Sequence, residues 1–152
     1  MIIATKGARS MKKIDQLQTM YEHTGIHPGY DLLRYMALPD LLGKDQDTIL
    51  YILGKNMSRA LEITTVEELV DAFKVIGLGD LVHVKEKRSE DLFDLTSPLI
   101  TARKKAELNQ TYHFEAGLIS GAMETVHGFQ CEAEETVKAK KSLVEFTVKH
   151  YR

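Results

Sequence analysis

Cys131 is the strongest nucleophile that the sequence offers, because it is the only cysteine of the chain. A catalytic cysteine needs a neighbouring group that stabilises its thiolate. His127 precedes it by four residues and Glu115 lies further upstream, so either is a candidate base. A free cysteine, however, is usually a small buried core residue. We therefore favour packing for Cys131, keep a cysteine-dependent enzyme as the less favoured alternative, and predict no catalytic residues.

Two short patterns resemble ligand sites but lack essential parts. Gly54 and Lys55 lack the earlier glycine and the following Ser or Thr of a phosphate-binding loop. Asp45 and Asp47 resemble the start of a calcium loop, but its glycine and closing Glu are missing. Helix capping explains the two aspartates better, and we predict no nucleotide or calcium site.

The histidines do not form a recognisable metal-binding motif. His23 and His27 are four residues apart, but Gly25 and Pro28 interrupt the helix that would align them. The remaining histidines are scattered along the chain: His83, His113, His127 and His150. Structural and catalytic zinc sites need three or four convergent ligands. The sequence therefore predicts no metal site, and it leaves any cofactor unknown.

Small residues are spaced four apart in the stretch EAGLISGAMETVHGFQC, residues 115–131. On a helix, Gly117, Ser120 and Gly121 lie opposite the large apolar side chains. This small face permits close approach of a strand, another helix or a second chain, or it forms the floor of a ligand groove. Close packing is the favoured alternative. The ligand hypothesis assigns binding to Gly117, Ser120, Gly121 and Cys131.

The hydrophobic pattern predicts helices first and antiparallel strands afterwards. It predicts a weak short helix before residue 27, a second one that stops at Pro39, a helix over 47–61, and a helix over 66–76 opened by a Thr65–Glu68 capping box. The period then changes to two, which predicts strands at 81–84 and 92–95, a helical turn near 100–105, a helix over 114–127, and strands at 129–137 and 143–149. This order favours an α+β fold.

Length and charge limit the class of protein. The 152 residues fit one domain, which we place at 28–152, with 1–27 as a weakly structured or short helical extension and 1–10 as its loose end. The net charge of −2 argues against nucleic-acid binding. No apolar run reaches the ~20 residues of a membrane span, and no signal peptide is recognisable. We therefore expect a cytoplasmic protein that is not integral to a membrane.

Basic residues gather in two predicted connections. Arg103, Lys104 and Lys105 form one cluster, and Lys138, Lys140 and Lys141 form the other. Charge runs in connections are usually solvated surface, and this is the favoured interpretation. A patch for an acidic partner or a lipid head group is the alternative.

Several segments resemble the YslB-like proteins of Gram-positive bacteria, a family without established activity. They are LPDLLGKDQDTILYILGKNMSRAL (38–61), GLGDL (77–81), SPLITAR (97–103), FEAGLISGAM (114–123) and VEFTVKHY (144–151). That family is similar to the superfamily of TRAPP vesicle-tethering subunits, 4-vinyl-reductase domains and haem nitric-oxide sensors. The resemblance implies N-terminal helices packed on a twisted antiparallel sheet.

The resemblance also carries expectations about the site. Gly117 and Gly121 match the glycines of the 4-vinyl-reductase helix, and Cys131 resembles the cysteine that follows it. The second, C-terminal cysteine of that pattern is absent, and the haem sensors' proximal histidine has no counterpart here. TRAPP subunits hold an acyl chain and dimerise through helices, so the resemblance implies both as options for this chain.

We therefore expect a non-enzymatic regulatory or interaction module, a homodimer that binds an apolar small molecule, a lipid or a protein partner. The alternative is a scaffold protein without a ligand, whose helices between residues 30 and 61 form the interface. Aromatic residues are enriched at interfaces. The predicted interface anchors are Tyr30, Tyr35 and Tyr51.

Overall fold

The computed structural model describes residues 11–152, so the extension predicted at 1–10 lies outside the described part. The N-terminal half is helical: α1 (Lys13–Thr24), α2 (Gly29–Leu32), the π-helical η2 (Leu33–Ala37), α3 (Leu38–Leu42), the 3₁₀ turn η3 (Gly43–Asp45), α4 (Gln46–Ala60) and α5 (Val66–Ile76). The remainder comprises β1 (Asp80–Glu86), β2 (Glu90–Thr96), α6 (Pro98–Lys105), α7 (His113–His127), β3 (Gln130–Lys138), the 3₁₀ turn η4 (Ala139–Lys141) and β4 (Leu143–Tyr151).

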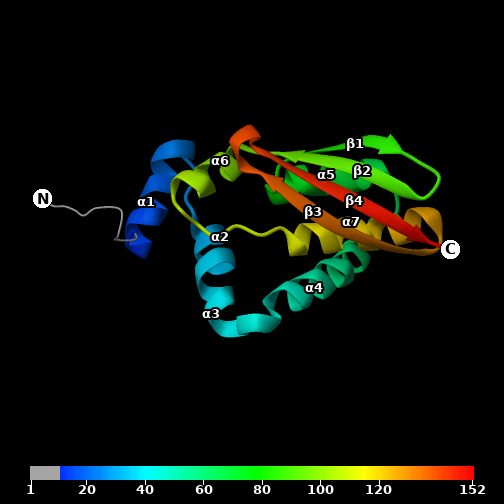
Figure 1. The fold of residues 1–152 in the computed structure, drawn as a ribbon, viewed down its shortest axis with the longest axis horizontal. Helices are drawn as coiled ribbons and strands as arrows, with labels where there is room; N and C mark the ends of the chain where they lie inside the picture. Colours follow the sequence, from blue (N-terminus) through cyan, green and yellow to red (C-terminus); the bar gives the residue numbers. More distant parts are fainter. Residues whose placement is uncertain (1–10) are drawn as a thin grey trace, which may run out of the picture.

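The strands form one antiparallel sheet in the order β1-β2-β4-β3. Helices α5 and α7 pack on one face of the sheet, and α4 packs along α7 and reaches the edge strand β3 through side chains (Figure 1). The predicted α+β fold with an antiparallel sheet is confirmed. Both hairpins and the long helices lie where the hydrophobic periods predicted them, with boundaries shifted by at most two residues.

Local signals explain several of these boundaries. The Thr65 hydroxyl accepts the amide hydrogen of Glu68, and the Glu68 carboxylate accepts the Thr65 amide, so the predicted capping box is present at the start of α5. Gly77 and Gly128 end α5 and α7 in the left-handed conformation that glycine adopts without strain. Asp45 stands at the start of α4 but makes no side-chain capping bond.

Helix α7 is the centre of the domain, and its small residues let α4 approach closely. A Cβ placed on Gly117 would overlap the carbonyl oxygen of Tyr51, and one placed on Gly121 would lie 3.0 Å from the carbonyl oxygen of Lys55. On α4, Gly54 faces α7 in the same way, with Leu118 N 2.8 Å from a built Cβ. The favoured alternative, close packing, is therefore what the structure shows, and α4 is the element that approaches.

The prediction that the second helix stops at Pro39 is wrong. The helical path continues from Gly29 to Leu42, and Pro39 lies in the first turn of α3. Proline lacks an N–H and crowds the carbonyl four residues earlier, which would be that of Tyr35. The π-helical turn over 33–37 widens the helix just before this point, as π-bulges do. The chain therefore accommodates the proline without ending the helix.

The N-terminal helices cover a second, smaller core. Helix α1 packs against α6, and the side chain of Met20 is 1% exposed there. This cluster contains Met20, Tyr35, Met36, Ala102, Ala106 and Leu108. The short helix predicted before residue 27 is therefore present as α1. A domain boundary at residue 28 stays a prediction.

Candidate functional site

A buried carboxylate lies at the end of the sheet where β2 begins and β4 ends. In β2, Asp91, Phe93 and Leu95 alternate with half-buried residues and face α5 and α7. The same alternation in β4 places His150 in line with Val148 on the inner face. Asp91 is completely buried. The strand pattern thus puts an ionisable group in a row otherwise occupied by core side chains.

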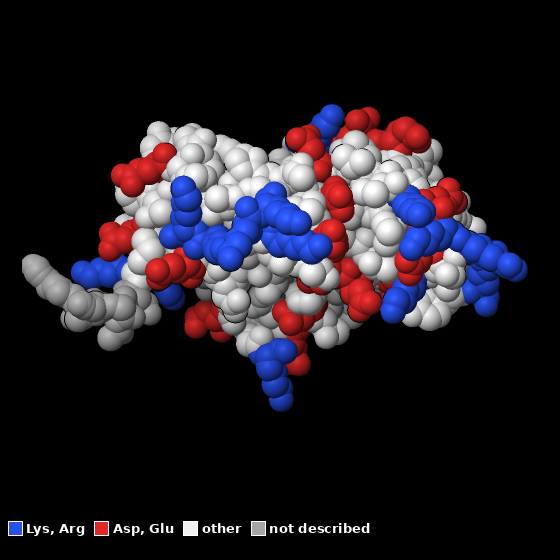
Figure 2. Space-filling view, turned by 45° about the horizontal axis from the view of Figure 1, so that its top comes forward, with Lys and Arg blue, Asp and Glu red and all other residues white. Residues whose placement is uncertain are grey.

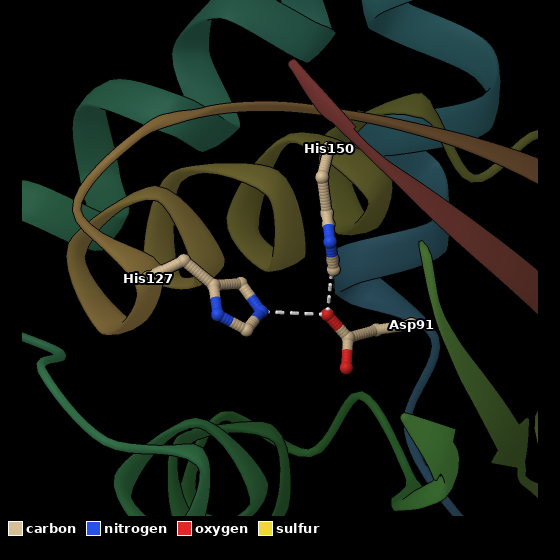
Figure 3. A group of neighbouring side chains, drawn as sticks. All are labelled: Asp91, His127 and His150. Carbon is tan, nitrogen blue, oxygen red and sulfur yellow. Dashed lines mark hydrogen bonds and ion pairs between the residues drawn. The ribbon is translucent and has the colours of Figure 1, made fainter. Parts of the chain in front are cut away.

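Three histidines from three elements converge on Asp91. The Nε2 atom of His83, in β1, lies 2.8 Å from Oδ1. The Nε2 atoms of His127, the last residue of α7, and His150, in β4, lie 2.7 and 2.6 Å from Oδ2. Figure 3 shows the rings of His127 and His150 meeting the same carboxylate oxygen from different directions. We call Asp91, His83, His127 and His150 the histidine cluster.

The cluster is held by aromatic neighbours. Phe93 stacks on His83 with ring centroids 4.6 Å apart, and Phe129 stacks on His127 at 5.1 Å. Burial opposes ionisation of Asp91, but the hydrogen bonds from the three histidines outweigh it and lower the pKa of the carboxyl. The ligand atoms of Asp91, His127 and His150 all lie within 4.8 Å of one another, a spacing that suits a shared ion.

Sequence reasoning missed this cluster. The histidines interpreted as scattered are brought together by the β2–β4 pairing and by the end of α7. The available signal was the period of two: continuing the apolar row Val144, Phe146, Val148 by one step reaches His150. The same step back from Phe93 reaches Asp91. Polar residues that continue an inward-facing row indicate a buried polar site.

A cavity of about 230 Å³ lies between the N-terminal helices and the end of α5. Most of its wall is apolar, and three polar side chains also line it. The lining residues are Met20, Ile26, His27, Pro28, Tyr30, Asp31, Ile76, Gly77, Leu78 and Leu99. We call this the N-terminal cavity. It lies near α1 and α6, away from the C-terminal end of β4 in Figure 1.

Buried ion pairs connect two of the cavity residues to the centre of the fold. Asp31 accepts a 2.6 Å hydrogen bond from Nε of Arg103. Tyr30 accepts a 2.8 Å hydrogen bond from Arg34, whose guanidinium also binds both carboxylate oxygens of Glu115 at 2.9 and 3.2 Å. Burial opposes the charge on Arg34, but Glu115 outweighs it and raises the pKa. The polar wall of the cavity is thereby linked to the first turn of α7.

The residues predicted to bind a ligand lie under α4. Gly117 and Gly121 pack on its backbone, and the buried Ser120 donates a 2.7 Å hydrogen bond to the carbonyl oxygen of Cys131. A ligand on this face would occupy space that α4 fills, so ligand binding by these residues stays a prediction that requires α4 to move. The thiol of Cys131 is buried, which is the main reason that its pKa rises to about 11.

The three tyrosines predicted as interface anchors do not share one exposed face. Tyr35 is only 8% exposed, and its hydroxyl donates to the carbonyl oxygen of Thr111 within the chain. Tyr51 donates a 2.6 Å hydrogen bond to Glu132 and so ties α4 to β3. Tyr30 is 43% exposed. The Tyr30 hydroxyl accepts a hydrogen bond from Arg34, so all three hydroxyls make contacts inside the chain, and an interface role stays a prediction.

The predicted basic clusters meet in space, because α6 and η4 are in contact. The exposed members are Lys104, Lys105, Lys140 and Lys141, whereas Arg103 is buried in its ion pair with Asp31. Figure 2 shows a band of Lys and Arg side chains on this side of the molecule, bordered by acidic residues. None of the helices in the described range 11–152 is both long and apolar enough to cross a membrane.

Comparison with known proteins adds a family and a fold. The family model described as a protein of unknown function, DUF2507, matches residues 27–149. The chain is 33% identical over 120 residues to the uncharacterised protein YslB of Bacillus subtilis, covering 79% of this chain and 81% of that protein.

Three solved structures share the fold. A vinyl-4-reductase family protein from Methanocaldococcus jannaschii superposes with a TM-score of 0.62 at 22% identity, covering 93% of this chain and 98% of that one. The phenol-responsive sensory domain of the transcription activator PoxR, solved with phenol, gives 0.58 at 11% identity, covering 93% and 92%. An H-NOX protein from K. algicida gives 0.53 at 12%, covering 91% and 88%. The predicted superfamily resemblance is confirmed at the level of the fold.

Proposed function

The chain belongs to the DUF2507 family, and we propose that it is a non-enzymatic, cytoplasmic regulatory module that binds a small apolar molecule in the N-terminal cavity. The observation that carries this proposal is the cavity itself, with a largely apolar wall and polar side chains at one side. Binding sites for small molecules are mostly apolar concave spaces with a few placed polar groups. The N-terminal cavity has this composition.

The size of the cavity favours a single-ring or short-chain ligand. An apolar cavity of about 150 Å³ can hold benzene, and the N-terminal cavity measures about 230 Å³. The hydroxyl of Tyr30, the carboxylate of Asp31 and the ring of His27 would orient a polar group on the ligand. The PoxR domain, which shares the fold, was solved with phenol, so a monocyclic phenol is a reasonable first probe.

The buried ion pairs provide a route from the cavity to the rest of the fold. Tyr30 and Asp31 are hydrogen-bonded to Arg34 and Arg103. A ligand that moves either of the two cavity side chains would therefore also move its arginine partner. Arg34 in turn holds Glu115 at the start of α7. A ligand that binds better to one arrangement of these pairs would favour that arrangement and so shift α7 against the N-terminal helices. A ligand changes a conformational equilibrium in this way, by stabilising the state that it binds better.

The experiment is a titration of ¹⁵N-labelled protein with phenol, p-cresol and hexanoate, followed by NMR. We expect saturable shifts at amides around the cavity, such as those of Ile26 and Leu78, with at least one of the three probes. Ile26→Trp, which fills the cavity mouth, should weaken binding at least about tenfold, because a close-packed site tolerates no added volume.

The matched control is Ile14→Trp, which changes the same residue type on an exposed part of α1 outside the cavity lining. It should bind the probe like the unchanged chain. Absence of saturable shifts with all three probes at millimolar concentration would exclude the proposal. Equal binding by the two Trp variants would place the ligand elsewhere and would exclude the cavity as the site.

Homodimerisation through the helices between residues 30 and 61 is a second candidate. Large apolar side chains are exposed along α2 to α4: Leu32, Leu33, Leu41, Ile49, Ile52 and Leu53. Exposed apolar patches often mark interaction sites. Because Tyr35 is internal, these aliphatic residues replace the tyrosines as the proposed anchors.

Sedimentation equilibrium tests the dimer. We expect a dimer for the unchanged chain and a monomer for Ile52→Glu, because a charge at the centre of an apolar interface loses its hydration. Val75→Glu is the matched control, since Val75 is an exposed apolar residue on α5, outside the proposed face. A monomeric unchanged chain at all accessible concentrations would exclude the homodimer.

A further inference from the structure

We propose that Asp91, His127 and His150 form a binding site for a divalent transition-metal ion, with Zn²⁺ as the expected occupant. The ligand atoms of these three residues lie within 4.8 Å of one another, and they approach from β2, α7 and β4. The site is separate from the N-terminal cavity, which is lined by none of these residues. It therefore extends the proposed function with a second ligand of different chemistry.

The donor set suits this class of ion. Zn²⁺ binds both imidazole nitrogen and carboxylate oxygen, and some catalytic zinc sites use two histidines and one carboxylate. Two histidines and one carboxylate also form the facial arrangement used for iron(II). Tetrahedral zinc at about 2.0 Å from each donor sets neighbouring donors about 3.3 Å apart, so the present 2.6 and 2.7 Å contacts must widen by about 0.6–0.7 Å. Small side-chain rotations achieve such a change.

Burial orders the ligands before an ion arrives. The side chains of Asp91 and His150 are 0% and 2% exposed, whereas that of His127 is 14% exposed. An ion would enter beside His127, and Phe129 limits the movement of that ring by stacking on it. His83 binds the other oxygen of Asp91 and orients the carboxylate, the role of an outer-shell partner in metal sites.

One atom of the cluster is unexplained by the hydrogen bonds alone. Nδ1 of His150 is buried, and it has no partner among residues 11–152. A buried polar atom without a partner needs a specific reason, such as a functional site or a bound ion. When Nε2 of His150 binds a metal ion, its ring proton lies on Nδ1, and a water molecule would have to accept it, because no described residue does.

Proton balance makes metal affinity depend on pH. Each histidine binds the ion through an unprotonated Nε2 and Asp91 binds it as a carboxylate, so protonated rings must release protons first. The ion takes the place of the Nε2–H protons between the rings and Oδ2, and each displaced proton moves to Nδ1 of its ring or leaves to solvent. Affinity should therefore fall as the pH is lowered.

The test uses the full chain without a polyhistidine tag, stripped with a chelator and dialysed. Isothermal titration with Zn²⁺, together with elemental analysis of the dialysed product, should give one ion per chain. His127→Gln and His150→Gln should each lower the affinity about a hundredfold or more, since even outer-shell changes cost 10–100-fold. Glutamine retains an N–H that can donate to Asp91, which favours folding of both variants.

His23→Gln is the matched control, because His23 is an exposed histidine on α1 far from the cluster in the sequence. It should bind Zn²⁺ like the unchanged chain. A second measurement needs no variant: Co²⁺ should give the visible absorption of a tetrahedral site, and the ¹⁵N shifts of the His127 and His150 rings should move together. Binding well below one equivalent, or equal binding by His127→Gln and His23→Gln, would overturn the proposal and leave a metal-free hydrogen-bonded cluster.

Discussion

At the scale of single residues, each strongly buried charge is matched by a specific partner. Arg34 pairs with Glu115 at 2.9 Å, and Arg103 pairs with Asp31 at 2.6 Å. Asp91 is matched by three histidines rather than by one arginine. A buried charge is costly when its partner is absent. These residues therefore fix how the elements that carry them sit against one another.

The thiol of Cys131 provides a prediction at this scale. Burial, followed by the nearby carboxylates of Glu124 and Asp91, raises its pKa to about 11. At pH 8 only about one molecule in a thousand carries the thiolate, which is the nucleophile. We expect iodoacetamide to label the folded chain at least about tenfold more slowly than the urea-unfolded chain. The rate should rise as the pH is raised from 8 towards 10.

Mass spectrometry follows the labelling directly, because Cys131 is the only cysteine. Cys131→Ser should remain unlabelled and serves as the control for side reactions. Rapid labelling of the folded chain near neutral pH would contradict the packing interpretation and would revive a cysteine-dependent enzyme.

At the scale of elements, the contact between α4 and α7 depends on glycine. An alanine in place of glycine usually stabilises a helix by roughly 1 kcal/mol. At Gly117 the sign should reverse, because the added Cβ would overlap the backbone of Tyr51. We expect Gly117→Ala to lower the free energy of unfolding by about 1–3 kcal/mol, the usual cost of overpacking. Urea unfolding followed by circular dichroism measures the change.

Gly29→Ala is the comparison for that experiment. Gly29 starts α2, and a built Cβ there meets nothing within 4 Å. This variant should unfold at the same urea concentration as the unchanged chain or at a slightly higher one. If Gly117→Ala were equally neutral, the two helices would not be as close as the structure places them.

Most elements could be predicted from the sequence, because the period of a helix or a strand is a local property. The effect of Pro39 could not be predicted in this way. Proline usually ends a helix, and the π-helical turn that lets the helix continue through Pro39 has no clear local sequence pattern. The histidine cluster was missed because it depends on pairing between distant segments. Asp91 and His150 are 59 residues apart, and only the sheet register places them together.

The small face of α7 marks the limit of such predictions. The spacing of Gly117 and Gly121 indicated that something approaches closely, and it left a helix, a strand, a second chain or a ligand open. Helix α4 can fill this role because it carries Gly54 where it meets α7, and any side chain at that position would overlap the α7 backbone. A pattern on one helix does not identify its partner, because complementarity belongs to the pair.

At the scale of the whole molecule, the N-terminal helix and the rest of the chain share a core. Met20 on α1 is buried between Tyr35 and the α6 segment, whereas Ile14 on the same helix is 68% exposed. We expect Met20→Ala to lower the free energy of unfolding by about 2–5 kcal/mol, the range for large-to-small core changes. Ile14→Ala should change it by less than about 0.5 kcal/mol.

Chemical denaturation of both variants measures these changes in the free energy of unfolding. The result also tests whether the folded domain begins at residue 28. A large effect of Met20→Ala on a single cooperative transition would make α1 part of the folded domain and would move the boundary before residue 28. Equal, small effects of the two variants would support a domain that begins at 28, with α1 as an appended helix.

The strand order also determines which strands could pair with another copy of the chain and cause aggregation. Strands β1 and β3 are the edges of the sheet, and each has a row of backbone groups that another chain could pair with. The register of β1 shifts between His83 and Lys85, and β3 carries Glu132, Glu134 and Glu135. Irregular and charged edges disfavour strand-to-strand aggregation. Both edges of the sheet therefore disfavour fibril-like growth, in which copies of the chain would add strand to strand.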